Sequence, residues 1–172
     1  MKYDNEILNS PIKNLSLNEL LEVYKRYHNE VDDFIDKSLE FICNVKKSSI
    51  KSKSIYLQLD SDLGSCYVRS GFDKFSKFGH PCFCISNIYF NEEFQSNGIF
   101  KVISAIITTL CLKNQWIFYV ENPLEEKLQK FLKKSGFKNN DIHTIGNYFF
   151  MLPKDILISE NELYSLEKSM NF

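Results

Sequence analysis

The residues that could do chemistry gather in a short polar turn between two apolar segments. Residues 95–98 read Gln-Ser-Asn-Gly, follow an apolar stretch that ends at Phe90, and precede an apolar run that starts at Ile99. The first turn of a helix leaves backbone N–H groups unpaired and carries a partial positive charge. A glycine there lets a phosphate approach the backbone, so the turn is either a plain helix start or an anion cradle.

The cradle hypothesis gives each residue of the turn a role. The Gln95 amide would donate to the anion, and backbone N–H groups would line the cradle at Ser96, Asn97, Gly98, Ile99 and Phe100. Lys101 either reaches a phosphate or lies on the solvent side of the helix. The motifs G-x-G-x-x-G and G-x-x-x-x-G-K-[ST] are absent from the chain. The strand before the turn and the strongly apolar helix after it favour the cradle.

The composition is that of an ordinary globular protein. The 172 residues fit one domain, and 44% hydrophobic with 15% aromatic residues exclude a disordered chain. The formal net charge of -1 gives no global reason to expect a nucleic-acid or membrane surface. Lysines gather at 46–53 and 127–138, where they form either a solvated face or the rim of an anion site.

The spacing of the cysteines bears on metal binding, and the apolar runs bear on where in the cell the protein is located. The five cysteines have no zinc spacing, so we expect no metal site. Cys82 and Cys84 would share one face of a strand as small core residues in a reducing compartment. No apolar signal segment opens the chain, and its most apolar run, 99–112, is too short to span a bilayer. We therefore expect a soluble, cytoplasmic protein with no membrane partner; its oligomeric state stays open.

Two kinds of periodicity predict the elements that position the turn. Helical spacing predicts two helices up to about residue 45 with a break near His28-Asn29, after a capping box of Ser16 and Glu19. A short edge strand is predicted at 3–8. Alternating or apolar runs predict strands at 54–60, 66–70, 82–90, 115–121 and 147–153, the first two joined by a turn at 60–65. Further helices are predicted at 98–113, from Asn122-Pro123 to a closing Gly136, and at 159–170.

This order of elements predicts an α+β fold with a mixed, mostly antiparallel central sheet flanked by helices. Strand 82–90 is apolar enough to be covered on both faces. The helix after it should be mostly buried, with Lys101, Ser104 and Thr108 as a narrow polar stripe. We expect one domain over 1–172: a helical pair with the edge strand (1–48), a sheet core with the turn (54–153) and a helical tail (154–172).

Residues 83–152, about 70 in number, resemble the Gcn5-related N-acetyltransferase superfamily. The family's pyrophosphate loop reads [RQ]-x-x-G-x-[GA] after a long central strand, and this chain matches it at Gln95 and Gly98. It departs at Phe100, where a large side chain either narrows the cradle or points into the core. Asn122 and the pair Gly136-Phe137 resemble the family's next strand end and helix end.

The resemblance implies how a cofactor would bind. Strands 82–90 and 115–121 would splay apart and admit the pantetheine arm of acetyl-CoA or another acyl-CoA. Backbone groups of Ile88, Tyr89 and Phe90 would pair with that arm, and the Ile88 N–H would polarise the thioester carbonyl. Lys101 and Asn122 would complete the cofactor site.

The acid and the base are less clear. Many members of the family place a proton-donating tyrosine four residues before the closing glycine, but here that residue is Leu132. Tyr119, Tyr148 or water would serve instead. Glu121, at a strand end, is the first choice for a general base, with Glu92 and Glu93 as alternatives. It is otherwise a surface acid or a charge at a helix N-terminus.

The resemblance implies an acyl-CoA-dependent N-acyltransferase in which an amine attacks the thioester directly. The amine is of unknown class, a small molecule or a protein. One alternative is a non-catalytic binding or inhibitor module on the same fold. Another is a base-modifying member with the lysines of 127–138 on a nucleic acid, which the near-zero net charge disfavours.

Overall fold

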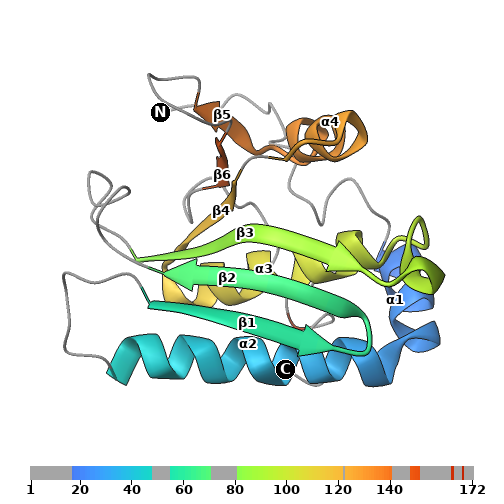
Figure 1. The fold of residues 1–172 in the computed structure, drawn as a ribbon, viewed down its shortest axis with the longest axis horizontal. Coiled ribbons are helices and arrows are strands. Elements are labelled where there is room, and N and C mark those ends of the chain that lie inside the picture. The colour runs from blue at the N-terminus through green and yellow to red at the C-terminus, as the bar shows by residue number, and fades with distance from the viewer. Residues whose placement is uncertain are drawn as a thin grey trace.

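The computed structural model describes residues 17–47, 55–70, 81–121, 123–140 and 148–151, with Tyr164 and Lys168 (Figure 1). The elements are, in chain order, α1 (Leu17–Arg26), α2 (His28–Lys47), β1 (Ile55–Ser61), β2 (Gly64–Ser70), β3 (Cys82–Phe90), a 3₁₀ helix (Glu92–Phe94), α3 (Ile99–Asn114), β4 (Ile117–Glu121), α4 (Glu126–Lys134), β5 (Lys138–Asn140) and β6 (Tyr148–Met151). The predicted edge strand at 3–8, residue Ser16 of the capping box, and nearly all of the predicted helix 159–170 lie outside the described residues.

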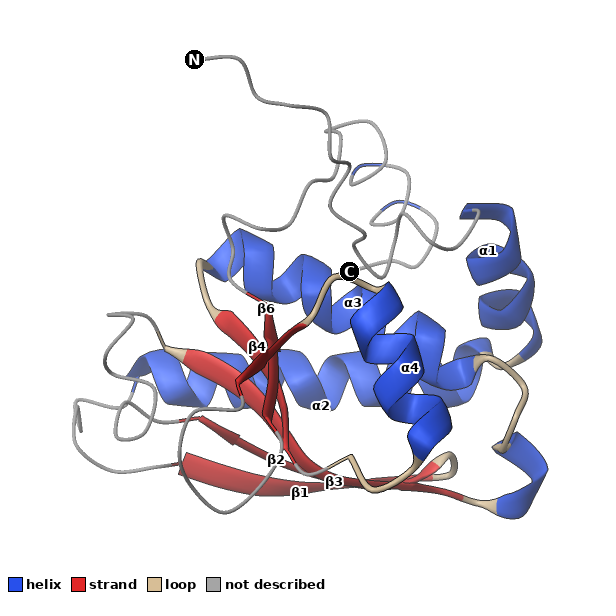
Figure 2. Cartoon of the chain, turned by 90° about the horizontal axis from the view of Figure 1, so that it is seen from above, coloured by secondary structure: helices blue, strands red, loops and turns tan. Residues whose placement is uncertain are grey.

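The strands form one six-stranded sheet in the order β1-β2-β3-β4-β6-β5. Only the β3–β4 pair is parallel, and the other neighbouring strands are antiparallel. The predicted α+β class with a mixed, mostly antiparallel sheet is therefore confirmed. Helices α2 and α3 lie on the same side of β1–β3 and cover this face of the sheet (Figures 1 and 2).

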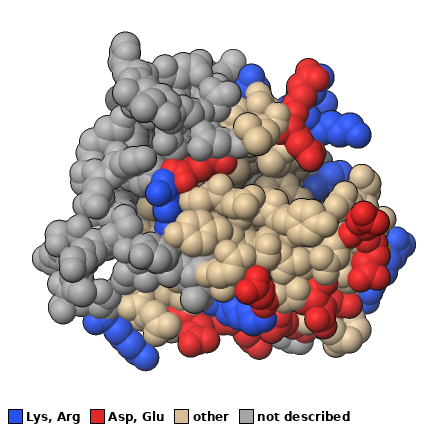
Figure 3. All heavy atoms as spheres, in the orientation of Figure 1, with Lys and Arg blue, Asp and Glu red and all other residues tan. Residues whose placement is uncertain are grey.

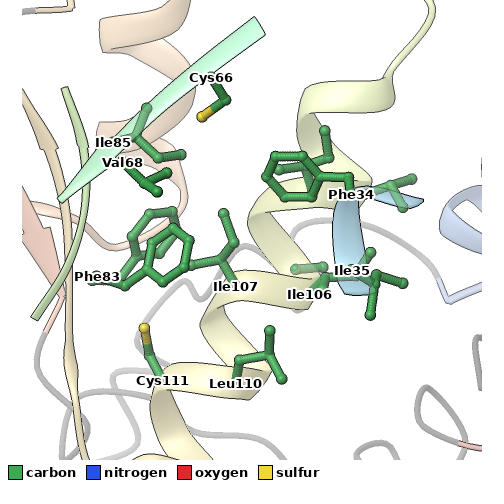
Figure 4. Packing of buried hydrophobic residues seen from close by; sticks show 14 of the residues in the cluster. Phe34, Ile35, Cys66, Val68, Phe83, Ile85, Ile106, Ile107, Leu110 and Cys111 are labelled. Atoms are coloured by element: carbon green, nitrogen blue, oxygen red, sulfur yellow. The ribbon is translucent and has the colours of Figure 1, made fainter. Parts of the chain in front are cut away.

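The main core lies between this face and the helices. Phe83 and Ile85 of β3 and Val68 of β2 alternate toward it, and α3 presents apolar residues around most of its circumference (Figure 4). The prediction of a mostly buried α3 is confirmed. The predicted polar stripe is not, because Ser104 and Thr108 are fully buried and only Lys101 of the three is exposed.

The two N-terminal helices join where the sequence predicts a break, near His28. Helix α1 ends at Arg26 and α2 starts at His28, and the Tyr24 hydroxyl spans the joint by donating to Asp32 Oδ1 at 2.6 Å. Helix α1 also packs toward the chain after β3, where Tyr27 and Phe94 lie edge to face with ring centroids 5.6 Å apart. The end of α1 and the following Tyr27 therefore help to position the candidate turn.

The β1–β2 hairpin is tighter than predicted. Strand β2 starts two residues earlier than predicted, β1 ends one residue later, and the turn is only Asp62-Leu63 instead of residues 60–65. Gly64 explains how β2 can start so early, because its φ of +138° is open to glycine and a Cβ there would lie 2.1 Å from the Tyr89 carbonyl oxygen. Glycine thus lets the hairpin lie directly against the end of β3.

Helix α4 confirms the predicted end but not the predicted start. It begins at Glu126, so Pro123 lies before the helix, where its carbonyl accepts a 2.8 Å hydrogen bond from Gln129 Nε2. At the other end Gly136 has φ +82°, and the Phe137 N–H donates to the Leu132 carbonyl at 3.0 Å. This is a Schellman C-cap. Strand β5 was not predicted, because its three polar residues carry no alternating apolar pattern.

Candidate functional site

Strands β3 and β4 part in the middle of the sheet. Their parallel ladder runs from Cys82–Ile117 to Ile85–Val120 and stops there. Strand β3 continues to Phe90 with β2 as its partner on one side, and within the described residues no strand pairs with residues 86–90 on the other. Figure 1 shows β4 leaving the line of β3. The parallel ladder therefore stops one residue before the end of β4 at Glu121, and β3 continues beyond it.

A β-bulge lies at the point of separation. Tyr67 pairs with Asn87 and the next residue, Val68, pairs with Ile85, so Ser86 is the extra residue of β3. A bulge re-aims the side chains that follow it. Here it moves the core-facing positions of β3 from Phe83 and Ile85 to Ile88 and Phe90, which are half-buried against the core.

The prediction that strand 82–90 is covered on both faces is therefore wrong for its second half. Residues 82–85 are buried, but Asn87 is exposed and Tyr89 is 54% exposed on the face away from the helices. The strand reads CFCISNIYF, and its only polar residues after Cys84, Ser86 and Asn87, lie where the cover ends.

Glu121 lies one residue beyond the last rung of the β3–β4 ladder. Its side chain is 7% exposed, and both of its oxygens are engaged. Ser86 Oγ donates to Oε2 at 2.6 Å, and Arg69 Nη2 forms an ion pair with Oε1. Glu121, expected as a general base, is thus part of a cluster that joins β2, β3 and β4. Arg69 was missed because its partner lies two strands away in a register that the sequence does not display.

Tyr119 and Tyr148 are the two candidate acids, and the structure describes the side chain of Tyr119 alone. Tyr119 is fully buried in a second cluster with Cys82, Cys84 and Ile117, on the sheet face away from the helices. Burial, aided by Cys82 and Cys84, raises the pKa of the Tyr119 hydroxyl above its ordinary range, so it keeps its proton at neutral pH. The backbone of Tyr148 pairs with Glu121, and its side chain lies outside the described residues.

The structure also describes the other residues that were considered for acid–base chemistry. Leu132 is fully buried in the main core. Glu92 and Glu93, the alternative bases, are exposed in the 3₁₀ helix that follows β3. They therefore lie on the connection to α3 and not at the separation of the strands.

The connection from β3 to α3 runs from Asn91 to Gly98. It contains the 3₁₀ helix, and two side-chain amides brace it. Gln95 Nε2 donates to the Phe90 carbonyl at 2.8 Å, and Asn97 Nδ2 donates to the Glu93 carbonyl at 2.8 Å. The Gln95 amide, expected on the anion, is thus engaged within the loop itself.

The backbone of the turn carries the free donors. Within the described residues, no oxygen accepts a hydrogen bond from the backbone N–H groups of residues 96–100. Ser96 has φ +61°, and Gly98, the N-cap of α3, has φ +82° and ψ 0°. A left-handed residue followed by helical ones makes successive N–H groups converge into an anion-binding concavity. The geometry at Gly98 and Ile99 is of this kind.

The side chains around the turn leave the concavity uncrowded. The Phe100 ring packs edge to face on Phe131 of α4, with centroids 5.7 Å apart, so it points toward the core and away from the cradle. Lys101 is exposed on the first turn of α3. A Cβ on Gly98 would lie 3.3 Å from Val23 Cγ2 of α1, which forms the near wall. Asn122 lies outside the described residues.

The surface around the site is mixed in charge. In the orientation of Figure 1, the face over β2 and β3 is mainly uncharged, and charged side chains gather at its rim (Figure 3). The described lysines of 127–138 are exposed, and Lys130 pairs with Glu126 at 2.7 Å. In the described part of the chain, no group of three or more His, Cys, Asp or Glu residues could hold a metal ion. No helix there is long and apolar enough to cross a membrane.

Comparisons with protein-family models, with curated proteins and with solved structures found no match to this chain. The chemistry must therefore be argued from the site. Its two parts are a strand edge at 86–90 and a turn of N–H donors at 96–100, neither of which has a backbone partner among the described residues, and the braced connection joins them. The first can pair with an amide-bearing chain, and the second can hold an anionic group.

Proposed function

We propose that the chain is an acyl-CoA-dependent N-acyltransferase with the architecture of the Gcn5-related N-acetyltransferases, and that it transfers acetyl from acetyl-CoA to an amine. One observation carries the proposal. The β3 edge that loses β4 as its partner leads, within one connection, to the turn whose N–H groups have no acceptor in the described part of the chain. A pantetheine arm carries amides, and the attached pyrophosphate is anionic, so one molecule satisfies both parts.

The residues of the turn fit the pyrophosphate. The backbone donors of Ser96 to Phe100 hold it, and the Phe100 ring does not compete for the space because it packs on Phe131. Lys101, exposed on the first turn of α3, adds a positive charge nearby. The Gln95 amide holds the connection in shape through the Phe90 carbonyl.

The residues of the strand edge orient the reacting group. Backbone groups of Ile88, Tyr89 and Phe90 bind the pantetheine arm, and the Ile88 N–H is the proposed donor to the carbonyl oxygen. Bound acetyl-CoA supplies the thioester that the amine attacks. Tyr119 holds its proton firmly because its pKa is raised, which makes it a poor donor to a thiolate. Water or Tyr148 is therefore the better candidate for that proton.

The test combines binding with turnover. Acetyl-CoA at about 100 times its dissociation constant should stabilise the protein by about 2.7 kcal/mol, which raises the melting temperature by roughly 5–10 °C for a chain of this size. Free thiol should then appear when an amine panel is added, with an equal amount of acetylated amine by mass spectrometry. Absence of any stabilisation would overturn the proposal. Stabilisation without thiol release on any amine would support a non-catalytic binding module instead.

A further inference from the structure

The end of the β3–β4 ladder coincides with a side-chain cluster. Ile85 and Val120 form the last backbone rung, and the next residue of each strand is Ser86 and Glu121. These two are joined by a 2.6 Å hydrogen bond between side chains. A side-chain bond thus takes over at the position where the backbone bonds stop.

Arg69 ties the third strand to the same place. The register pairs it with Cys84 of β3, which in turn pairs with Tyr119 of β4. Glu121 follows Tyr119 by two residues and so lies on the same sheet face. The Arg69 side chain therefore extends across β3 to reach Glu121 Oε1. We call Arg69, Ser86 and Glu121 the junction cluster.

Stability alone does not account for the junction cluster. A mostly buried ion pair is often no more stable than a well-packed apolar replacement. This pair is also incompletely satisfied, because Arg69 Nε is buried without a hydrogen-bond acceptor among the described residues. The bulge at Ser86, which leaves β3 one residue out of register, is held by the same contacts.

We propose that the junction cluster positions the cofactor-binding edge of β3, and that Glu121 is a positioning residue and not the general base. The ion pair and the Ser86 bond fix where β3 leaves β4 and keep the bulge in place. Without them the bulge can shift along β3, and a shift by one residue turns Ile88 and Phe90 away from the core and changes which N–H groups face the gap. This inference rests on the proposed function, because it assigns a task at the acyl-CoA site.

The decisive experiment compares acetyl-CoA affinity, turnover and stability in matched variants. Arg69→Met and Glu121→Gln should each raise the acetyl-CoA dissociation constant by about tenfold or more. Arg69→Met combined with Glu121→Met should be no worse than either single change, because the two residues act through one contact. The melting temperature of this double variant should equal or exceed that of the wild type. Glu126→Gln, in the exposed pair with Lys130 on α4, is the control and should leave affinity unchanged.

Turnover separates positioning from proton transfer. If Glu121 positions the strand, Glu121→Gln keeps the wild-type pH profile of kcat and changes KM for acetyl-CoA, and Arg69→Met does the same. Arg69→Lys should restore part of the affinity that Arg69→Met loses. The proposal is overturned if Glu121→Gln abolishes kcat at unchanged affinity while Arg69→Met keeps kcat, since that is the behaviour of a base.

A separate measurement covers the case in which the wild type does not bind acetyl-CoA, which would defeat the proposed function. Backbone amide exchange of the protein without ligand then tests the cluster directly. Residues 86–90 should exchange about tenfold faster or more in the Arg69→Met, Glu121→Met variant, while α2 keeps its wild-type protection. Unchanged exchange at 86–90 would show that the cluster does not hold this edge.

Discussion

Gln95 and Asn97 use their side-chain amides to brace the turn that Gln95 was expected to open to a ligand. Each donates to a carbonyl of the same connection, at 2.8 Å. The donors for an anion at this turn are then the backbone N–H groups of residues 96–100. Binding at this turn should therefore depend on local charge and backbone shape more than on the identity of the polar side chains.

Ser96→Asp tests this at a single residue. Ser96 is exposed and already left-handed, a conformation that aspartate tolerates. A negative charge about 5 Å from a phosphate should cost about 1–3 kcal/mol, so we expect acetyl-CoA to bind at least about fivefold more weakly. The unfolding free energy should stay level or rise slightly, because the charge lies near the positive end of α3. Calorimetric titration and thermal unfolding measure the two effects.

Gln115→Glu is the matched control at the opposite end of α3. Gln115 is also exposed and left-handed, with φ +56°, and the change adds the same charge. It should lower stability slightly, since it faces the negative end of the helix, and leave acetyl-CoA binding unchanged. Equal weakening by both variants would point to a general charge effect and against a site at the turn.

At the scale of elements, the β1–β2 hairpin and β3 depend on one glycine. Gly64→Ala would place a Cβ against the Tyr89 carbonyl oxygen, a backbone atom that cannot move without displacing β3. We expect a loss of about 3 kcal/mol or more in unfolding free energy, measured by denaturant titration. Gly98→Ala should cost only about 1–2 kcal/mol, because the new methyl meets the movable end of Val23 at a left-handed residue. A smaller cost for Gly64→Ala than for Gly98→Ala would contradict this packing.

How far the elements could be predicted depended on whether a local pattern encodes them. The apolar run after Gly98 and the closing Gly136 each carry a local signal, and both α3 and the end of α4 lie where predicted. The predicted start of α4 at Pro123 was wrong. Proline suits the first turn of a helix, but here Pro123 lies before the helix and its carbonyl accepts a hydrogen bond from the Gln129 side chain. Strand β5 has no pattern to find.

The candidate site was predictable in position but not in its contacts. Glu121 was expected because a carboxylate at the end of a strand is visible in the sequence. The partners of Glu121 were not predicted, because its contact with Arg69 depends on the strand order and its contact with Ser86 depends on the bulge. The packing of Phe100 on Phe131 likewise joins two helices that only the tertiary structure brings together.

For the whole molecule, the buried acidic groups predict a loss of stability in alkali. Burial raises the pKa of the Cys66 thiol to about 12 and that of Cys111 well above its ordinary value. An unfolded thiol loses its proton near pH 8.5, so above that pH the native state binds more protons than the unfolded state. Each such group makes the unfolding free energy fall by about 1.4 kcal/mol per pH unit, up to its native pKa.

Cys66→Ala should therefore reduce the alkaline slope of stability. Between about pH 9.5 and 11.5 the unfolding free energy of the variant should fall about 1.4 kcal/mol per unit less steeply than that of the wild type. Cys43→Ala, at an exposed cysteine of α2, is the control and should keep the wild-type slope. Denaturant titrations across this range under reducing conditions provide the comparison, and identical slopes for all three proteins would rule out the burial effect at Cys66.

The central claim is that the β3 edge and the turn before α3 bind one acyl-CoA molecule, and residue-level amide exchange with and without acetyl-CoA tests it most directly. We predict that saturating acetyl-CoA slows exchange in two segments, 86–90 and 96–100, which the connection joins. Helix α2, which lies outside both segments, should be unaffected. Unchanged exchange in both segments would contradict the account.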